Sequence, residues 1–165
     1  MRIAVMPGSF DPFTLGHSDI LARSCKLFDY VHVGVLVNKK KTGLFTHAER
    51  VAQIKKVIDD MGIKNADAES FVGLTADFAK QHGACAIIRG VRSVSDYENE
   101  MKMADLNAKI GDGIETVILF SKPENTHVSS SAVREICEFG GDISGFVPRV
   151  IYDEVMERTG NGNEE

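Results

Sequence analysis

The sequence lacks the features that mark disulfide-rich, zinc-ribbon and membrane-spanning proteins. Its three cysteines, Cys25, Cys85 and Cys137, are far apart and odd in number, so they predict neither a disulfide framework nor a zinc site with closely spaced ligand pairs. No apolar run approaches the roughly 18 residues of a membrane-spanning helix. The first residues enter an apolar strand without the regions of a signal peptide. We therefore expect a cytoplasmic protein with reduced cysteines and no membrane partner.

The sequence also lacks net positive charge. It has 24 acidic and 19 basic residues and a formal net charge of −5. Nucleic acids and anionic membranes are bound through net or clustered positive charge, so this balance argues against both as partners, and any anion site must be local. A chain of 165 residues that is 43% hydrophobic can bury one α/β domain well. We place this single domain at residues 1–159 and a polar C-terminal tail at residues 160–165.

Five short apolar segments alternate with segments of helical periodicity. Strands are expected at about residues 3–6, 30–37, 68–72, 84–88 and 116–120. Helices are expected at about residues 17–28, 46–61, 74–81, 95–110, 129–139 and 150–156, the fourth of them capped by Ser95 and Glu98. This alternation predicts an α/β fold with a Rossmann-like, doubly wound, five-stranded parallel sheet and right-handed crossovers. Ligands bind such sheets at the carboxyl ends of the strands, where the strand order reverses.

Residues 8–17 join the first predicted strand to the first predicted helix. Gly8 and Gly16 let the backbone approach a ligand, and His17 adds a donor close to the helix start. The first N–H groups of a helix have no carbonyl partners and carry partial positive charge, which favours an anion there. The segment therefore has two interpretations, a nucleotide-phosphate site or a tight connection with a capping histidine.

Polar clusters follow the other predicted strands as well. Residues 39–42 follow the second strand, Thr75 lies just past the third, residues 89–100 follow the fourth and residues 125–131 follow the fifth. The carboxyl ends of parallel strands meet at one edge of a sheet. A single ligand-binding cleft at that edge could therefore contain residues from all of these clusters.

Three cations and three serines in these clusters suit an anionic substrate. Lys41, Arg89 and Arg92 lie at the expected mouth of an otherwise acidic protein, where arginine can bind phosphate in a bidentate manner. The lysine run at residues 39–41 can equally be a solvated loop. The serines at residues 129–131 begin a predicted helix, so they fit either an N-cap or a phosphate cradle.

The remaining titratable residues give no sign of a covalent mechanism. We interpret Asp96 and Glu98 as an ordinary charged helix start. The other histidines are interpreted as surface or packing residues: His32, His47, His82 and His127. No serine, histidine and aspartate or cysteine and histidine arrangement marks a nucleophile. A site of phosphate donors without a nucleophile fits direct transfer, in which one substrate attacks the other.

Several of these motifs resemble those of a known enzyme family. Thr14-x-Gly16-His17, behind the turn Gly8-Ser-Phe-Asp-Pro12, resembles the T-x-G-H signature of the nucleotidyltransferase superfamily that includes the class I aminoacyl-tRNA synthetases. Together with Ile88-Arg-Gly-Val-Arg-Ser-Val-Ser-Asp-Tyr-Glu-Asn-Glu-Met101 and the serines at residues 129–131, the chain resembles bacterial phosphopantetheine adenylyltransferases over about residues 1–158. The resemblance implies direct in-line transfer of the adenylyl group of ATP to 4′-phosphopantetheine, giving dephospho-CoA and pyrophosphate in coenzyme A synthesis. It also implies that Mg²⁺ is held on the polyphosphate, with no protein metal ligand.

The resemblance also implies roles for individual residues. His17 would stabilise the transition state, Lys41 and Arg89 would grip the incoming phosphate, Ser9 would lie at the boundary of the two substrates and Thr75 would line the pantetheine arm. The ATP site would consist of Ser9, Phe10, His17, Gly90, Val91, Arg92, Glu100, Asn125, Thr126, His127, Val128, Ser129, Ser130 and Ser131. The family forms homohexamers, so the same is expected here.

The chain departs from the family pattern at two places. Position 9 is serine where some members have threonine, which keeps the hydroxyl. Residues 125–128 read Asn-Thr-His-Val where the family commonly has an aromatic residue, serine and then phenylalanine, so side-chain contacts at residues 125–127 are in doubt. Two alternatives remain: another nucleotidyltransferase of the superfamily, acting on nicotinamide mononucleotide or a phosphorylated alcohol, and a nucleotide-binding protein without catalysis.

Overall fold

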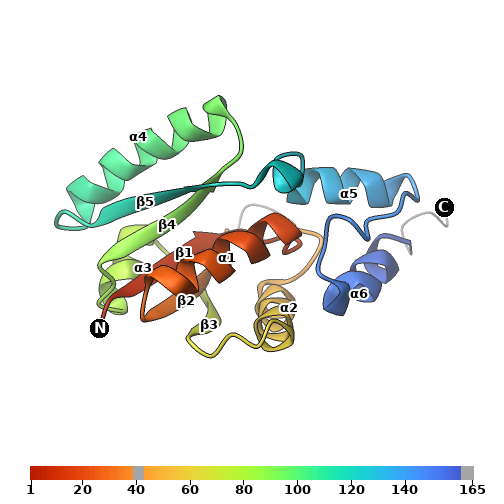
Figure 1. Ribbon diagram of the computed structural model, residues 1–165, viewed down its shortest axis with the longest axis horizontal. Helices are drawn as coiled ribbons and strands as arrows, with labels where there is room; N and C mark the ends of the chain where they lie inside the picture. Colours follow the sequence, from red (N-terminus) through yellow and green to blue (C-terminus); the bar gives the residue numbers. More distant parts are fainter. Residues whose placement is uncertain (39–42, 161–165) are drawn as a thin grey trace.

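Five parallel strands form the centre of the computed structural model, which describes residues 1–38 and 43–160 (Figure 1). The strands are β1 (Ile3–Gly8), β2 (Tyr30–Leu36), β3 (Ala66–Phe71), β4 (Ala86–Val91) and β5 (Glu115–Phe120). Their order is β3-β2-β1-β4-β5, and every neighbouring pair is parallel. The chain leaves β1 toward one edge of the sheet and β4 toward the other, so the predicted doubly wound α/β fold in a single domain is confirmed.

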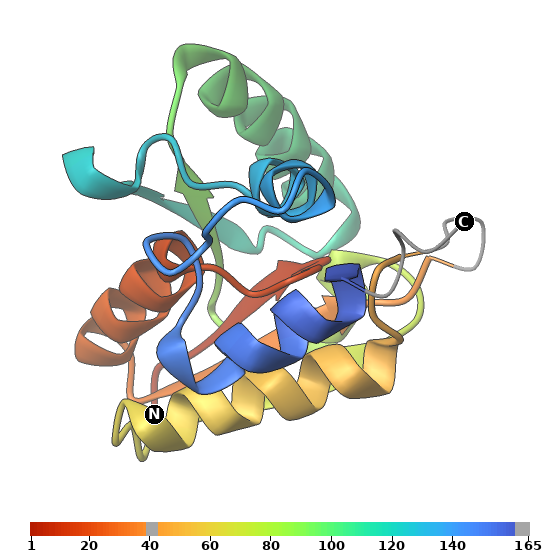
Figure 2. The same ribbon diagram turned by 90° about the vertical axis from the view of Figure 1, so that its right-hand side faces the viewer.

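Helices cover both faces of the sheet. They are α1 (Leu15–Leu27), α2 (His47–Asp60), α3 (Thr75–Gln81), α4 (Val94–Ile110), α5 (Ser130–Glu138) and α6 (Arg149–Gly160), with a short 3₁₀ turn η1 (Pro123–Asn125) before α5. The crossovers through α1 and α2 lie on one face, and those through α3 and α4 lie on the other. Figure 2 shows α6 lying along α2. Helix α6 therefore adds to the layer that α1 and α2 form on one face of the sheet.

Alternation along β2 explains how the two faces differ. Val31, Val33 and Val35 are fully buried under the helices of the α1 and α2 layer. The alternate positions face α3, where Phe78 packs over Gly34 and a Cβ at that glycine would lie only 2.5 Å from the phenyl ring. A side chain at residue 34 would therefore push α3 away from the sheet.

Two sequence predictions about the region around β4 are wrong in detail. The fourth strand runs from Ala86 to Val91 rather than over residues 84–88, because residues 89–91 continue the parallel ladder with residues 118–120 of β5. The helix that follows is capped by Ser93, whose Oγ accepts a hydrogen bond from the Asp96 N–H at 3.1 Å. Ser95, the predicted cap, lies inside the first turn, and its hydroxyl is hydrogen-bonded to that of Ser93.

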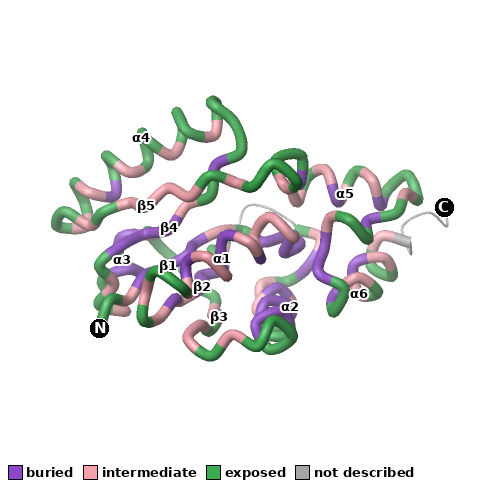
Figure 3. Tube along the Cα trace, viewed as in Figure 1, coloured by how far each residue is buried: buried purple, intermediate pink, exposed green. Residues whose placement is uncertain are grey.

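The outer surface of α4 is more apolar than that of the other helices. Val94, Tyr97, Met101, Leu106 and Ile110 are all exposed, with exposed fractions between 42% and 75%. Figure 3 shows α4 as mostly exposed or intermediate over its whole length.

Two further features concern the C-terminal end of the fold and the possibility of a membrane-spanning helix. Helix α6 ends at Gly160, and the rest of the predicted tail, residues 161–165, lies outside the described residues. Among the helices that the structure describes, none combines the length and the hydropathy needed to cross a membrane.

Candidate active site

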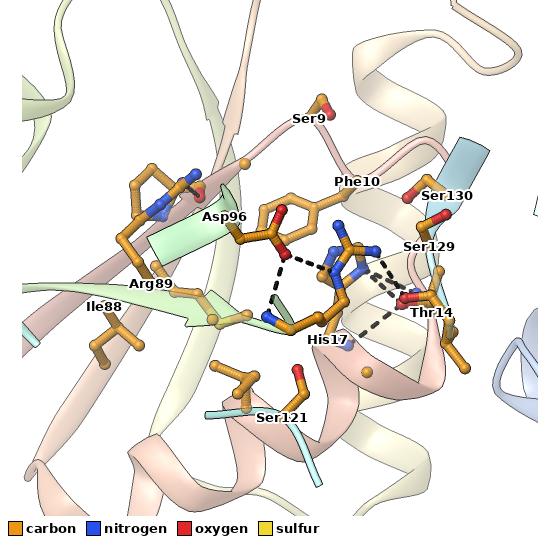
Figure 4. A pocket seen from close by; sticks show the side chains of 18 of the residues that line it. Ser9, Phe10, Thr14, His17, Ile88, Arg89, Asp96, Ser121, Ser129 and Ser130 are labelled. Carbon is orange, nitrogen blue, oxygen red and sulfur yellow. Dashed lines mark hydrogen bonds and ion pairs between the residues drawn. The ribbon is translucent and has the colours of Figure 1, made fainter. Parts of the chain in front are cut away.

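A pocket opens at the carboxyl ends of β1 and β4, where the strand order reverses. This is the place at which doubly wound sheets bind ligands. The pocket has a volume of about 310 Å³ and is lined by residues 6–10, the start of α1, the end of β4, the start of α4 and the residues that begin α5. Figure 4 shows side chains from these separate segments around one cavity.

The first turn of α1 is closed by a capping box that contains a histidine. The Oγ1 of Thr14, the N-cap residue, accepts a hydrogen bond from the His17 N–H at 3.3 Å. In return, Nδ1 of the His17 ring accepts a hydrogen bond from the Thr14 N–H at 3.0 Å. Glutamate or glutamine usually holds this third position of a capping box. The two interpretations of His17 are therefore compatible, because the ring both caps the helix and lines the pocket.

The surroundings of His17 fix its protonation state. The rings of Phe10 and Phe13 lie with their centroids 5.0 and 5.2 Å from the imidazole. Burial, together with the smaller effects of the positive charges of Arg92 and Arg89, lowers the pKa of His17 from 6.5 to about 4. At neutral pH the ring is uncharged, and since Nδ1 accepts from Thr14, the proton is on Nε2. His17 therefore offers the pocket a neutral N–H donor.

Arg89 is held in a fixed orientation at the end of β4. Its Nε and Nη2 donate to the two oxygens of Glu100, each at 2.7 Å, and its Nη1 donates to the carbonyl oxygen of Pro7 at 2.6 Å. The Arg89 side chain remains about one-third exposed, at 34%. Glu100 thus aims the arginine while part of the guanidinium still faces the cavity.

Arg92 joins the start of α4 to the loop before α5. Its backbone N–H and its Nε donate to one oxygen of Asp96, at 3.1 and 3.2 Å, and its Nη1 donates to the Val128 carbonyl at 3.0 Å. The pocket therefore contains two guanidinium groups, each oriented by a carboxylate from α4. Their positive charge suits a polyanionic ligand.

The start of α5 provides the opposite wall of the pocket. Ser129 is the N-cap and accepts from the Ala132 N–H at 3.0 Å, which confirms the cap interpretation for one serine. The Ser130 hydroxyl donates to the Pro12 carbonyl at 2.8 Å and so ties α5 to the first loop. Across the cavity, a Cβ at Gly16 would meet only ordinary contacts, the nearest 3.6 Å away. The packing of the chain does not require this glycine, whereas close approach of a ligand would.

A buried ion pair supports the first loop from behind. The Nε of Arg50 lies 3.2 Å from Oδ1 of Asp11, and both residues are only 6% exposed. Asp11 also accepts hydrogen bonds from the backbone N–H groups of Leu44 and Phe45 at 2.8 and 2.9 Å. Arg50 donates to the Ser9 carbonyl at 3.0 Å. This network fixes the segment that begins at Gly43 against the loop that lines the pocket.

The structure brings most of the sequence-predicted site residues together. The residues among them that line the pocket are Ser9, Phe10, His17, Arg89, Gly90, Arg92, Glu100, Val128, Ser129, Ser130 and Ser131.

Five of the predicted residues that the structure describes are not part of this lining, and a sixth lies outside the described residues. Val91 is buried in β4, and Thr75 is the first residue of α3, at the carboxyl end of β3. Thr126 and His127 follow η1, where the His127 ring packs edge-on against another aromatic ring. Asn125 lies beside the pocket, with its Cβ 4.0 Å from the position of a Cβ at Gly16. Lys41 lies outside the described residues.

Sequence reasoning missed three polar contributors to the pocket. Asp96 was interpreted only as part of a charged helix start, although its spacing of four residues from Arg92 fits an ion pair. Ser121 comes directly after β5, so the rule applied to the other strands predicts it too. The carbonyl oxygen of Pro7 accepts from Arg89, and the sequence carries no sign of that contact.

Comparison with known proteins agrees with this geometry. The cytidylyltransferase-like family matches residues 5–136. The chain is 47% identical to a phosphopantetheine adenylyltransferase of Clostridium novyi, and the match covers 97% of this chain and 98% of the relative. It is 48% identical to a phosphopantetheine adenylyltransferase of Clostridium beijerinckii, and that match covers 96% of this chain and 98% of the relative. The structure of Plasmodium falciparum nicotinic acid mononucleotide adenylyltransferase complexed with NaAD is similar in fold, with a TM-score of 0.70 and 15% identity over 99% of this chain and 96% of that one. The chain therefore belongs to the phosphopantetheine adenylyltransferase family of cytidylyltransferase-like nucleotidyltransferases.

Proposed function

We propose that this enzyme transfers the adenylyl group of ATP to 4′-phosphopantetheine, giving dephospho-CoA and pyrophosphate in coenzyme A synthesis. The observation that carries the proposal is the grouping of a neutral His17 donor with Arg89 and Arg92 at the N-terminus of α1. Family membership at nearly full length supports the substrate pair.

The chemical roles follow from the arrangement of donors. The phosphate of 4′-phosphopantetheine attacks the α-phosphorus of ATP in line, and negative charge grows on the α-phosphate oxygens. The Nε2–H of His17 and the first N–H groups of α1 stabilise that charge, as preorganised donors do best. Arg89, with Lys41, binds the attacking phosphate next to Ser9, and Thr75 contacts the pantetheine arm. Arg92, Glu100 and residues 125–131 belong to the ATP side.

Direct attack without a covalent intermediate suits the described pocket. The Thr14 hydroxyl lies 3.1 Å from Nδ1 of His17, but Thr14 is only 1% exposed and its Oγ1 already accepts from the His17 N–H. Its position in the helix cap keeps this hydroxyl away from an attack on ATP. The substrate phosphate is already an anionic nucleophile, so positioning and charge stabilisation suffice.

Mg²⁺ would enter on the triphosphate as part of the substrate. Asp96 and Glu100 are the only carboxylates among the described lining residues, and each is paired with an arginine. The described part of the pocket therefore fits a metal held by phosphate oxygens and water, which is the usual way of binding MgATP. An ion bound in this way would supply positive charge for the departing pyrophosphate.

We also propose that the enzyme forms a homohexamer and acts in the cytoplasm. The exposed apolar side chains of α4 support self-association, because exposed apolar surface is typical of protein contact sites. The three cysteines are free thiols, which fits a reducing compartment. Light scattering of the purified protein tests the assembly, and a monomeric mass would contradict it.

The decisive experiment measures pyrophosphate release by the purified protein with ATP, Mg²⁺ and 4′-phosphopantetheine. Parallel reactions replace the acceptor by nicotinamide mononucleotide or glycerol 3-phosphate, or ATP by CTP, and a His17→Ala variant serves as the matched control. Release only with ATP and 4′-phosphopantetheine, greatly reduced in the variant, is the expected result. Release with another pair would overturn the substrate, and ATP binding without any release would favour a protein that only binds nucleotides.

A further inference from the structure

Two histidines and a glutamate form a cluster on the face of the sheet that α3 covers. His32 comes from β2, Glu69 from β3 and His82 from the residue that ends α3. One ligand atom of each residue lies within 4.8 Å of those of the other two. None of the three lines the catalytic pocket, and the two histidines were interpreted from the sequence only as surface or packing residues.

The fold brings these distant residues together through strand register. His32 and Gly34 occupy the α3 side of β2, and Gly34 is directly opposite Glu69 in the ladder with β3. Because Gly34 has no side chain, Phe78 of α3 packs directly on the strand. The close approach of the helix brings the His82 ring over that of His32, with ring centroids 4.0 Å apart.

Hydrogen bonding within the protein leaves this cluster incomplete. Nε2 of His82 lies 3.0 Å from Oε1 of Glu69, yet this nitrogen is buried and has no hydrogen-bond partner in the described structure. Nδ1 of His32 lies 3.8 Å from the same carboxylate oxygen, beyond hydrogen-bond range. The ligand atoms of two imidazoles and a carboxylate thus lie close together, and Nε2 of His82 lacks a hydrogen bond.

We propose that His32, Glu69 and His82 form a site for a divalent transition metal, with Zn²⁺ as the preferred ion. Imidazole nitrogen together with a carboxylate oxygen is a ligand set typical of zinc, and a water would complete four-coordination. Ligands about 2.0–2.1 Å from a tetrahedral ion lie roughly 3.3 Å apart. The ligand atoms lie within 4.8 Å of one another, so binding of the ion requires the side chains to rotate toward a common point. The site connects β2, β3 and the end of α3, so its effect is to fasten that helix to the sheet.

The test measures Zn²⁺ binding directly. Protein stripped of metal with a chelator, in a Cys85→Ser background that removes the one exposed thiol, is titrated with ZnCl₂ by calorimetry, and bound metal is counted by elemental analysis. The ligand variants are His32→Gln, Glu69→Gln and His82→Gln. The matched control is His47→Gln, because His47 is a half-buried histidine at the start of α2 and is not part of the cluster. Circular dichroism verifies the fold of each variant.

We expect one Zn²⁺ per chain, unchanged in His47→Gln and weakened at least tenfold in each ligand variant. Co²⁺ in place of Zn²⁺ should give the visible absorption of a four-coordinate ion, and the Glu69→Gln variant should lose it. Zn²⁺ should also raise the melting temperature of the parent protein but not that of the ligand variants. Absence of stoichiometric binding, or equal binding by the ligand variants and the control, overturns the proposal. These readouts do not depend on the adenylyl transfer reaction.

Discussion

Replacing His17 by glutamine should remove part of the dependence of protein stability on pH. Glutamine at the third helical position is a standard partner in a capping box, so it can still accept from the Thr14 N–H and keep the first turn of α1 closed. It does not titrate. The comparison of the two proteins therefore isolates the cost of protonating the buried ring.

The sign and size of the effect follow from the lowered pKa. His17 has a pKa of about 4 in the folded protein, against 6.5 for an unperturbed ring, so the unfolded chain takes up a proton first as the pH falls. Stability is therefore lost with decreasing pH across the interval between these two values. Linkage gives a loss of about 2 kcal/mol between pH 7 and pH 5, and about 3 kcal/mol by pH 4.

Urea unfolding of the wild type and His17→Gln at pH 7, 6 and 5 measures this difference. The free energy of unfolding of the wild type should fall more steeply than that of the variant, with the gap widening by about 2 kcal/mol from pH 7 to pH 5. All other titrating groups are shared and cancel in the comparison. Parallel pH profiles for the two proteins would refute a buried, neutral His17.

Three other changes test separate parts of the site and its support. His17→Ala should lower kcat by about 10²–10³ or more while the Kd for ATP changes less, because one transition-state donor is lost; unchanged turnover removes His17 from the mechanism. Arg89→Ala should raise the KM for 4′-phosphopantetheine at least tenfold, and calorimetry showing unchanged affinity contradicts its role. Asp11→Asn should destabilise the fold by about 3–5 kcal/mol in urea unfolding, since it leaves Arg50 buried without its charge partner; a loss below 1 kcal/mol would mean that the ion pair is unimportant.

The sequence predicts the type of each large element but not all boundaries. Apolar runs and helical periodicity identify the five strands and the helices, because burial on one or both faces imposes those patterns. The fourth strand was ended too early, since Arg89 and Gly90 resemble a loop. They continue the ladder because Gly90 lets Ile20 pack closely, with a Cβ there meeting Ile20 at 3.0 Å.

The sequence likewise predicts the position of the candidate site but not all the contacts within it. Motifs that follow strands predict the pocket, because all carboxyl ends of a parallel sheet lie at one edge. The partners that orient the pocket side chains were harder to foresee: Glu100 was predicted to contact ATP, and the structure shows its carboxylate bound to Arg89. His32 and His82 are far apart in the sequence, and only the register of β2 and the packing of α3 place them together.

The turn before α1 contains both residues that line the pocket and residues that stabilise the loop. Ser9 and His17 line the pocket, whereas Asp11 points away from it and binds Arg50 and the backbone after Gly43. A Cβ at Gly43 would lie 1.8 Å from the Arg50 guanidinium, so that close approach requires glycine. Loss of Asp11 should therefore reduce activity through the shape and stability of the loop, while His17→Gln, which keeps the helix cap, should reduce activity with little loss of stability near neutral pH. Measuring both the turnover and the free energy of unfolding of each variant separates the catalytic role of His17 from the structural role of Asp11.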